Sequence, residues 1–405
     1  MFTFIYHGLR VVMDGASPTA FMWFFAYVWA VWSCKAIASR RYRPWTGEPH
    51  VRGVTVLVPV YNEPEAIFRS SLASVRFEQP SEMIAVVDGG DTRTAEIARE
   101  YCDQVVLIER SGKRAAIAAG LEVSDTSSDV VVVLDSDTVW EPDALRELLR
   151  PFEDPRVGGV TPQQAIFDAE HTAVRALANW IEDVRYHLTV PAQSVFGQVG
   201  CLAGRTIAYR RTAFEPAVER MLRQHVFGVP LEVGDDRVLT NELLRNGWRT
   251  VYQSSALVHT NAPSGWRGFW HQQLRWGRSS QRETLLSLRW LWRRPVAFAS
   301  FLTDIITPFA LYGVMALAIA HAIRGDDAAL ALPVLPAIAL AYIGMLTSIG
   351  VRQLGHLRRF PSDVRRLPLF VLQLTFVMVP IRIIAFATML HQGWGTRSVA
   401  LEGPR

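Results

Sequence analysis

Apolar runs alternate with helix-like segments between residues 51 and 262. Four runs are continuous and rich in β-branched residues, at 54–60, 83–88, 104–108 and 130–135. The segments between them, at 64–77, 92–102 and 113–123, have the apolar spacing of helices. Uninterrupted β-branched runs are typical of parallel strands that are buried on both faces. The pattern therefore predicts an α/β domain with a mainly parallel sheet and right-handed crossover connections.

Long uncharged stretches near the ends of the chain predict a membrane part. Thr19–Ala38 carries one charge, Lys35, and has about the length that spans a bilayer. The alternative is a buried helix of a large soluble protein. Three arginines follow within residues 40–43, which by the positive-inside rule places the next part of the chain in the cytosol.

Val296–Ile323 and Ala328–Gly350 predict two further spans. Their connection is short and acidic, whereas the loop at 351–366 is rich in arginine, so we expect an out-and-back hairpin that returns to the cytosol. Leu367–Leu390 contains Pro380 and Arg382 near its middle. Because a charge is costly in lipid, this segment is expected to bend near the proline, to be partly interfacial or to line a cavity, and to leave the C-terminus cytosolic.

Residues 264–295 are rich in Trp and Arg and directly precede a predicted span. This composition favours amphipathic helices that lie in the headgroup layer; the alternative, a nucleic-acid patch, would not explain the adjacent spans. The expected division is an N-terminal region at 1–45 with the span 19–38, a cytosolic domain at 51–262, interfacial helices at 263–295, transmembrane helices at 296–391 (spans 296–323 and 328–350 and the bent segment 367–390), and a cytosolic tail at 392–405.

Composition excludes several classes of protein. With 50% hydrophobic residues, the chain of 405 residues is neither disordered nor collagen-like. Its net charge of +4 does not argue for a nucleic-acid partner. The 3 cysteines lack metal-ligand spacing, which favours a reduced, cytosol-facing domain. Lys35 and Lys113 are the only lysines, so Lys113 stands out in the α/β domain.

Polar residues follow the predicted strands, at the sheet edge where such domains bind ligands. The first strand ends in Tyr61-Asn62-Glu63-Pro64, the second in Asp88-Gly89 and the fourth in Asp135-Ser136-Asp137. Carboxylates at i and i+2 after a buried strand can share one hard cation, although Asp is also common in ordinary turns. Mg²⁺ or Mn²⁺ there would bridge a diphosphate and stabilise its departure. The dinucleotide and P-loop glycine motifs do not occur in the sequence.

Three more motifs carry candidate chemistry. Lys113 and Arg114 open a helix, where they form either an anion site or a surface charge pair. Asp235 and Asp236, in Gly-Asp-Asp-Arg, also open a helix, as simple caps or with one of them as a general base. The segment QQLRW at 272–276 supplies an aromatic face for a sugar and a guanidinium for phosphate.

Taken together, these motifs resemble the processive glycosyltransferases of family two, which include hyaluronan, chitin-oligosaccharide, cellulose and certain capsule synthases. The resemblance runs from about residue 54 to residue 397. It depends on seven motifs in order: YNEP at 61–64, DG at 88–89, GKR at 112–114, DSD at 135–137, GDDR at 234–237, QQLRW at 272–276 and WGTR at 394–397. The fold it implies is a GT-A-type nucleotide-sugar domain attached to interfacial helices and a small transmembrane bundle.

The resemblance also implies roles by position. Tyr61, Glu63 and Asp88 would contact uridine, and Lys113 and Arg114 would hold the nucleotide. Asp135 and Asp137 would hold Mg²⁺ or Mn²⁺ on UDP, with Asp236 as the base and Asp235 beside it. Gln272, Arg275 and Trp276 would line the acceptor and diphosphate site, and Trp394, Thr396 and Arg397 would close over UDP.

One segment departs from the hyaluronan-synthase pattern. Residues 200–210 resemble capsule-type synthases, and they place Gly204 and Arg205 in the expected acceptor pocket. A buried guanidinium needs a partner. Arg205 would bind either a uronic acid of the growing chain or an internal carboxylate such as Asp235.

The expected protein is a multi-pass enzyme of the cell membrane with a cytosolic catalytic domain. It would transfer sugars from UDP-sugars with inversion, extend a β-linked polysaccharide and pass this acceptor through its own spans. The partners are thus the donor, the growing chain and the lipid bilayer, without nucleic acid. A non-processive enzyme that glycosylates a lipid is the first alternative, and a catalytically silent scaffold or transporter subunit is the second.

Overall fold

The four apolar runs predicted as strands are strands in the computed structural model, which describes residues 17–226, 228–231, 233–324 and 334–391. They are β1 (Val54–Val60), β2 (Glu82–Asp88), β3 (Gln104–Ile108) and β4 (Val130–Leu134). The intervening segments form α3 (Glu65–Phe77), α4 (Thr92–Arg99) and α5 (Lys113–Val123). These strands are neighbours in the order β3-β2-β1-β4 and pair in parallel, as predicted.

The complete sheet has eight strands, in the order β3-β2-β1-β4-β7-β6-β10-β5. The further strands are β5 (Val139–Trp140), β6 (Val157–Ile166), β7 (Thr206–Arg210) and β10 (Arg249–Thr260), and a separate hairpin consists of β8 (His225–Val226) and β9 (Val229–Pro230). β7 is antiparallel to β4 and β6, and β5 is antiparallel to β10. The sheet is thus mainly parallel, with two reversed strands that the apolar pattern did not predict.

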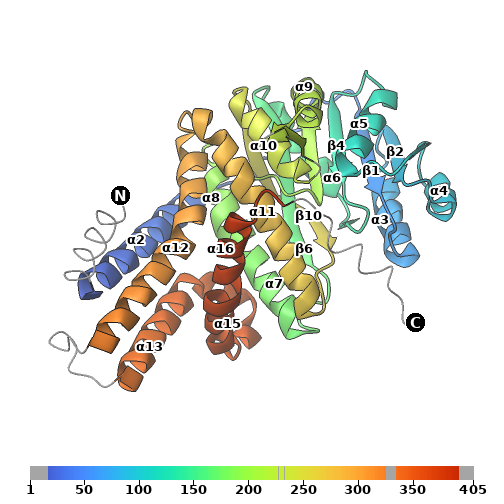
Figure 1. The fold of residues 1–405 in the computed structure, drawn as a ribbon. Helices are drawn as coiled ribbons and strands as arrows, with labels where there is room; N and C mark the ends of the chain where they lie inside the picture. The colour runs from blue at the N-terminus through green and yellow to red at the C-terminus, as the bar shows by residue number, and fades with distance from the viewer. Residues whose placement is uncertain (1–16, 227, 232, 325–333, 392–405) are drawn as a thin grey trace, which may run out of the picture. The chain divides into compact units, whose positions relative to one another are not determined.

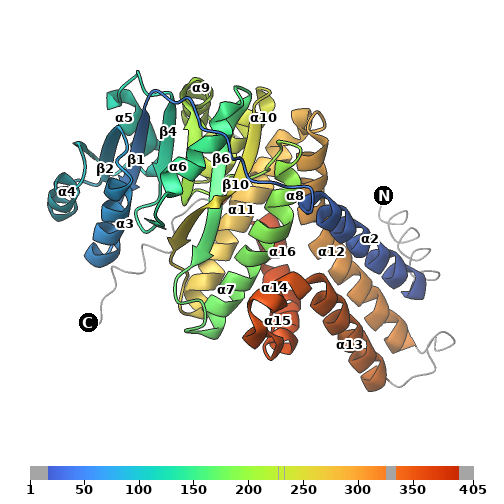
Figure 2. The same cartoon turned by 180° about the vertical axis from the view of Figure 1, so that it is seen from behind.

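Helices cover both faces of this sheet (Figures 1 and 2). The additional elements are α6 (Ala144–Leu149), η1 (Arg150–Glu153), α7 (Ala173–Val184), the π-helical turn η2 (Arg185–Thr189), α8 (Val190–Ser194), α9 (Arg211–Leu222) and α10 (Asp235–Arg245). One core layer joins the sheet to α3, α4 and α6, and the other joins it to α5, α9 and α10. Because every residue of β1, β2 and β4 is buried, these strands need the apolar side chains that the sequence supplies on both faces.

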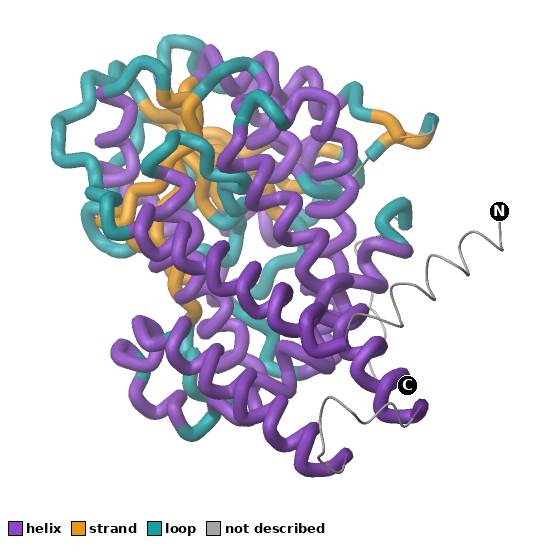
Figure 3. Tube along the Cα trace, turned by 90° about the vertical axis from the view of Figure 1, so that its left-hand side faces the viewer, coloured by secondary structure: helices purple, strands orange, loops and turns teal. Residues whose placement is uncertain are grey.

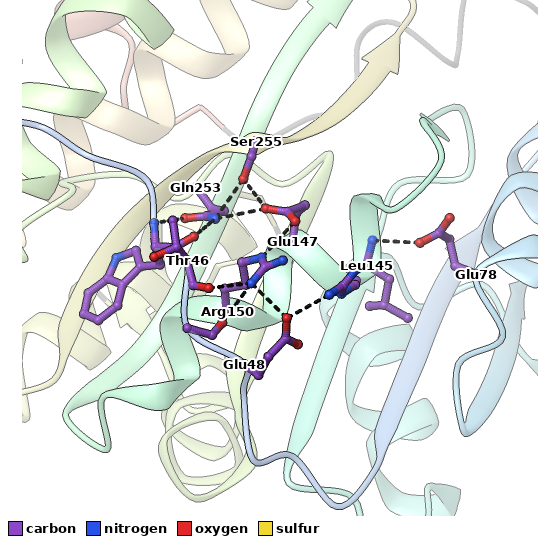
Figure 4. Close-up of polar contacts among 11 residues, drawn as sticks. Thr46, Glu48, Glu78, Leu145, Glu147, Arg150, Gln253 and Ser255 are labelled. Carbon is purple, nitrogen blue, oxygen red and sulfur yellow. Dashed lines mark hydrogen bonds and ion pairs between the residues drawn. The ribbon is translucent and has the colours of Figure 1, made fainter.

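The segment that precedes β1 is tied to the sheet by polar contacts (Figure 4). The Gln253 side chain accepts a hydrogen bond from the Trp45 N–H and donates one to the Trp45 carbonyl, both at 2.9 Å. The Tyr42 hydroxyl donates to the Tyr252 carbonyl and accepts from the Ser254 N–H. Arg150 donates to the carbonyls at residues 46 and 47. Residues 42–48 therefore follow a defined path along β10 and α6.

Residues 266–291 form one continuous helix, α11 (Trp266–Leu291), rather than the several helices expected. No proline interrupts this stretch. Gly277 is tolerated because a Cβ atom there would lie 2.8 Å from the Ala385 Cβ, so the glycine permits close packing. α11 buries polar residues such as Gln273 and Glu283 inside the protein. The interfacial position of residues 263–295 stays a prediction.

The chain divides into two compact units: a sheet unit at 38–301 and 385–405, and a helical unit at 1–37 and 302–384. The named strands all fall within the residue ranges of the sheet unit. Figure 3 shows them in orange. Three helices cross the boundaries between the units: α2 (Ser17–Ser39), α12 (Pro295–Arg324) and α16 (Val379–Ala387). The helical unit also contains α13 (Val334–Arg352), α14 (Leu354–Arg359), η3 (Pro361–Val364), α15 (Leu367–Gln373) and η4 (Leu374–Met378). In the described residues, two stretches, Pro295–Leu317 and Leu367–Ala387, have the length and apolar composition needed to cross a membrane.

The segment around Pro380 is helical throughout, with a π-helical turn at Leu374–Met378. Proline lacks an N–H and its ring crowds the carbonyl four residues earlier, so a wider turn there accommodates it. The bend predicted near Pro380 and the topology of the predicted spans stay predictions. The predicted cytosolic tail at 392–405 lies outside the described residues.

Gln253→Leu should lower the free energy of unfolding by roughly 1–3 kcal/mol, because the backbone N–H and carbonyl of Trp45 lose their partner while the buried site becomes apolar. Denaturant unfolding of the purified full-length chain measures this change. Arg146→Ala is the matched control, since it removes only an exposed ion pair with Glu48. Equal stability of the two variants would contradict a fixed path for residues 42–48.

Candidate functional site

The ammonium of Lys113 joins two of the predicted motifs. Lys113 is the first residue of α5, after Gly112 with its φ of 85°. Its Nζ lies 2.6 Å from Asp135 Oδ1 and 2.9 Å from Asp235 Oδ2. Burial alone would lower the pKa of Lys113, but the two carboxylates outweigh burial and raise it. The end of β4 and the start of α10 are therefore held together by one buried cation.

The two carboxylates of the Asp-Asp pair lie in different environments. Burial raises the pKa of Asp235, but the Lys113 ammonium outweighs it and holds that pKa below the ordinary value. Burial, together with repulsion from Asp235, holds the pKa of Asp236 above the ordinary value. Two neighbouring acids whose pKa values are pushed apart are typical of a site with divided roles. Asp236 is the member suited to accept a proton.

The segment predicted to form the acceptor pocket runs directly beside this pair. The Gly204 N–H donates to Asp236 Oδ2 at 3.3 Å, and the Asp135 N–H donates to the Arg205 carbonyl at 2.9 Å. A Cβ at Gly204 would lie 3.3 Å from Lys113 Nζ and 3.4 Å from Asp236 Cβ. Such a side chain would crowd both groups, so glycine permits this close approach.

Arg205 has an internal partner, but not the expected one. Its guanidinium pairs with Glu182 of α7 at 3.1 Å and donates to Gln164 at 2.9 Å. It also lies 5.5 Å from the centre of the Trp276 ring. The internal ion pair is therefore confirmed, but its carboxylate is Glu182 and not Asp235, which pairs with Lys113. Since Glu182 already neutralises Arg205, the case for a uronic acid partner falls away.

Glu182 is a site residue that we did not predict from the sequence. It is 5% exposed and faces Arg205 from the buried side of α7. The sequence feature that could have indicated it is a pair of adjacent acids, Glu182 and Asp183, after the mainly apolar stretch 176–181. A charge on the buried face of a helix indicates a partner, but sequence spacing does not identify that partner.

The residues at the ends of β1 and β2 form a second group. The Arg110 guanidinium lies 3.6 Å from the centre of the Tyr61 ring and pairs with Asp88. Asp88 also accepts the N–H groups of residues 111 and 112, at 2.7 and 3.0 Å. Ser136 donates to Glu63 at 2.8 Å. Asp88 thus orders the loop that positions Lys113, while the contacts of Tyr61, Glu63 and Asp88 with a uridine stay predictions.

Arg114 is buried, and its role in nucleotide binding stays a prediction. It is 4% exposed and donates to the carbonyls of Met221 and Val233 and to the Gln224 side chain. As the second residue of α5, it directly follows Lys113, and its charge helps to lower the pKa of Asp235. Its guanidinium holds the chain just before the Gly-Asp-Asp-Arg motif.

Asp135 and Asp137 follow β4, as predicted. In the described part of the chain, no group of three or more His, Cys, Asp or Glu side chains is arranged to hold a metal ion. Two carboxylates nevertheless suit Mg²⁺ or Mn²⁺ when phosphate oxygens complete the coordination sphere. The donor set thus fits an ion that binds together with a phosphorylated substrate.

Gln272, Arg275 and Trp276 lie on α11, within one turn of each other. Arg275 lines a pocket together with Val233, which directly precedes the Gly-Asp-Asp-Arg motif. Trp276 meets Arg205, as described above. The acceptor and diphosphate roles of these residues stay predictions. Trp394, Thr396 and Arg397 lie outside the described residues.

Comparison with known proteins defines the class. A mannosyltransferase of Pyrobaculum calidifontis, solved in complex with GDP-Man and Mn²⁺, has a similar fold, with a TM-score of 0.56 at 20% identity over 87% of this chain and 98% of that one. This likeness shows a GT-A-type fold. Residues 50–279 match the family described as glycosyltransferase like family 2. The chain belongs to this family and is a glycosyltransferase.

Two relatives cover most of the chain. Hyaluronan synthase of Streptococcus pyogenes is 29% identical over 369 residues, which make up 88% of this chain and 86% of that protein. An N-acetylglucosaminyltransferase of Rhizobium leguminosarum bv. viciae is 31% identical over 368 residues, 87% of this chain and 83% of that protein. The resemblance found in the sequence motifs is thus confirmed at the level of the family.

Lys113→Met should shift the acidic limb of the pH–rate profile to higher pH. The Lys113 ammonium lowers the pKa of Asp236, so its removal raises that pKa further above the ordinary value. A carboxylate base must be ionised, and the rate therefore rises with pH through this pKa. Measuring kcat against pH for wild type, Lys113→Met and the exposed control Arg99→Met tests this, and an unmoved limb would contradict the assignment.

Proposed function

We propose that the protein is a membrane-embedded, inverting and processive glycosyltransferase. It polymerises a β-linked extracellular or capsular polysaccharide from UDP-sugars and passes the chain through its own helices. The observation that carries the proposal is the meeting of Asp135, Lys113 and the Asp235–Asp236 pair at one end of the sheet. Relatives that align over most of the chain are named hyaluronan synthase and N-acetylglucosaminyltransferase, which supports the choice of reaction.

The different pKa values of Asp235 and Asp236 support a mechanism in which the acceptor hydroxyl displaces the diphosphate directly. Asp236, with its raised pKa, would accept the proton of the attacking hydroxyl, while Asp235 keeps Lys113 in place. The hydroxyl would then attack the sugar carbon from the side opposite the diphosphate. An α-linked donor gives a β-linked product by such a single displacement.

Asp135 and Asp137 would hold Mg²⁺ or Mn²⁺ on the donor diphosphate, where the ion stabilises the charge that develops on the leaving group. The structural neighbour that was solved with GDP-Man and Mn²⁺ supports a divalent ion. Lys113, whose Nζ lies 2.6 Å from Asp135, would keep that carboxylate next to the bound donor diphosphate.

The membrane assignment depends on the apolar segments. Pro295–Leu317 and Leu367–Ala387 have the length and composition to cross a bilayer, and α2 is an uninterrupted 23-residue apolar helix. Trp266, Leu288 and Trp292 are exposed at the two ends of α11, as expected for a helix near the headgroups. We place the catalytic domain on the cytosolic side, where UDP-sugars are available.

Activity should depend strictly on a divalent cation. Asp137→Ala should reduce turnover by on the order of 10²-fold or more while the fold is kept, because the ion loses one of its two protein carboxylates. Transfer of labelled sugar is measured with Mg²⁺ or Mn²⁺ and in excess EDTA. Glu122→Ala, an exposed carboxylate on α5, is the control. Full activity in EDTA would refute the metal assignment.

Asp236→Asn should keep donor binding and lower turnover ~10²–10⁴-fold, the usual contribution of a general base. Donor binding by calorimetry and initial rates of transfer separate the two effects. Asp235→Asn is the paired variant, and it should act mainly through the loss of the Lys113 ion pair. If Asp235→Asn loses more turnover than Asp236→Asn, the base is Asp235.

A further inference from the structure

One open pocket lies along α11 beyond the residues already assigned. It is lined by Val233, Arg275, Arg278, Ser279, Arg282 and His391. The four α11 residues lie at i, i+3, i+4 and i+7, so they share one face of the helix. The lining holds three guanidinium groups and an imidazole but no carboxylate. Its chemistry is therefore that of an anion site.

Arg278 is the guanidinium with the most capacity for a ligand. Its Nε–H donates to Thr388 at 2.9 Å, while its terminal nitrogens have no partner among the described residues. Burial lowers its pKa, and no carboxylate opposes that effect. Partial burial of a charged guanidinium group without a carboxylate partner costs free energy, and a bound anion would offset this cost.

Ser279 gives an independent indication of a ligand. It is 7% exposed, and its hydroxyl has no hydrogen-bond partner within the described part of the chain. The hydroxyl packs against Gly234, where a Cβ atom would lie 1.9 Å from Oγ and where φ is 92°. A buried hydroxyl that lines a basic pocket is a ready donor to an anion.

Arg282 forms the floor of the pocket rather than its principal ligand. It is 3% exposed, and its terminal nitrogens donate to the carbonyls of Val233 and Met389, at 2.9 and 3.2 Å. Val233 lies two residues before Asp235, so the pocket borders the catalytic motif through the chain itself. An anion bound here would lie next to that motif.

We propose that this pocket binds a diphosphate group, with Arg278 and Ser279 as direct ligands, and that it extends the donor site one turn of α11 beyond Arg275. A diphosphate presents several oxygens and more than one negative charge, which matches several guanidinium forks better than a single carboxylate does. The inference depends on the proposed use of nucleotide-sugar donors. It assigns residues outside the QQLRW motif to that use.

The test compares wild type, Arg278→Ala, Arg278→Lys, Ser279→Ala and the control Arg289→Ala in the purified full-length protein. Arg289 is an exposed arginine on the same helix, outside the pocket lining. Calorimetry measures the binding of UDP, inorganic diphosphate and uridine to each protein. Circular dichroism verifies that each variant is folded.

Arg278→Ala should bind UDP and inorganic diphosphate ~10- to 100-fold more weakly, the usual effect of losing a charged hydrogen bond, and should bind uridine as wild type does. Arg278→Lys should recover part of the affinity, and Ser279→Ala should lose less than Arg278→Ala. Wild-type affinity of Arg278→Ala for diphosphate would overturn the proposal. If wild type binds inorganic diphosphate through Arg278 but does not bind UDP, the pocket stands and the proposed donor is wrong.

Discussion

The Lys113 ammonium joins the parts of the proposed active site. It lies within 3 Å of Asp135 and Asp235, which come from distant parts of the chain. Without this cation, the carboxylates of Asp135, Asp235 and Asp236 would lose the ammonium group that pairs directly with two of them, and their mutual repulsion would increase. Asp88 fixes the loop before Lys113 by accepting the N–H groups of residues 111 and 112. The strand ends, the helix start and the acidic pair therefore form one electrostatic unit.

Three buried arginines donate hydrogen bonds to residues next to the acidic pair or to the neighbouring helix α11. Arg114 and Arg282 both donate to the Val233 carbonyl, at 2.9 Å, just before the acidic pair. Arg237, which follows that pair, donates to Thr284 of α11. These contacts fix the position of the Gly-Asp-Asp-Arg motif against α11, which carries the residues proposed to bind the acceptor and the diphosphate. The same guanidinium groups give this side of the site a positive potential that suits a phosphorylated donor.

Periodicity and strand-end chemistry predicted much of this arrangement. The apolar runs gave correct positions for β1 to β4, and the motifs at their ends meet where parallel strands bring them together. The expected burial on both faces is wrong for β3, an edge strand with no fully buried residue. Partners that depend on long-range packing could not be predicted. Glu182 reaches Arg205 only because α7 packs beside the segment 200–205, and Arg114 turns inward because the chain at 221–233 offers it carbonyl groups. The spacing of residues along the chain does not identify such contacts. The antiparallel strand β7 was not predicted for the same reason.

Polymer formation from UDP-sugars can be measured directly. The most direct measurement incubates the purified wild-type protein, in lipid and with Mg²⁺ or Mn²⁺, with single and paired UDP-sugars, and records released UDP together with product length. One donor or pair should release UDP in many-fold excess over enzyme and yield long chains that stay bound during synthesis. Transfer of a single sugar to a lipid, or no UDP release with any donor, would rule out a polymer synthase.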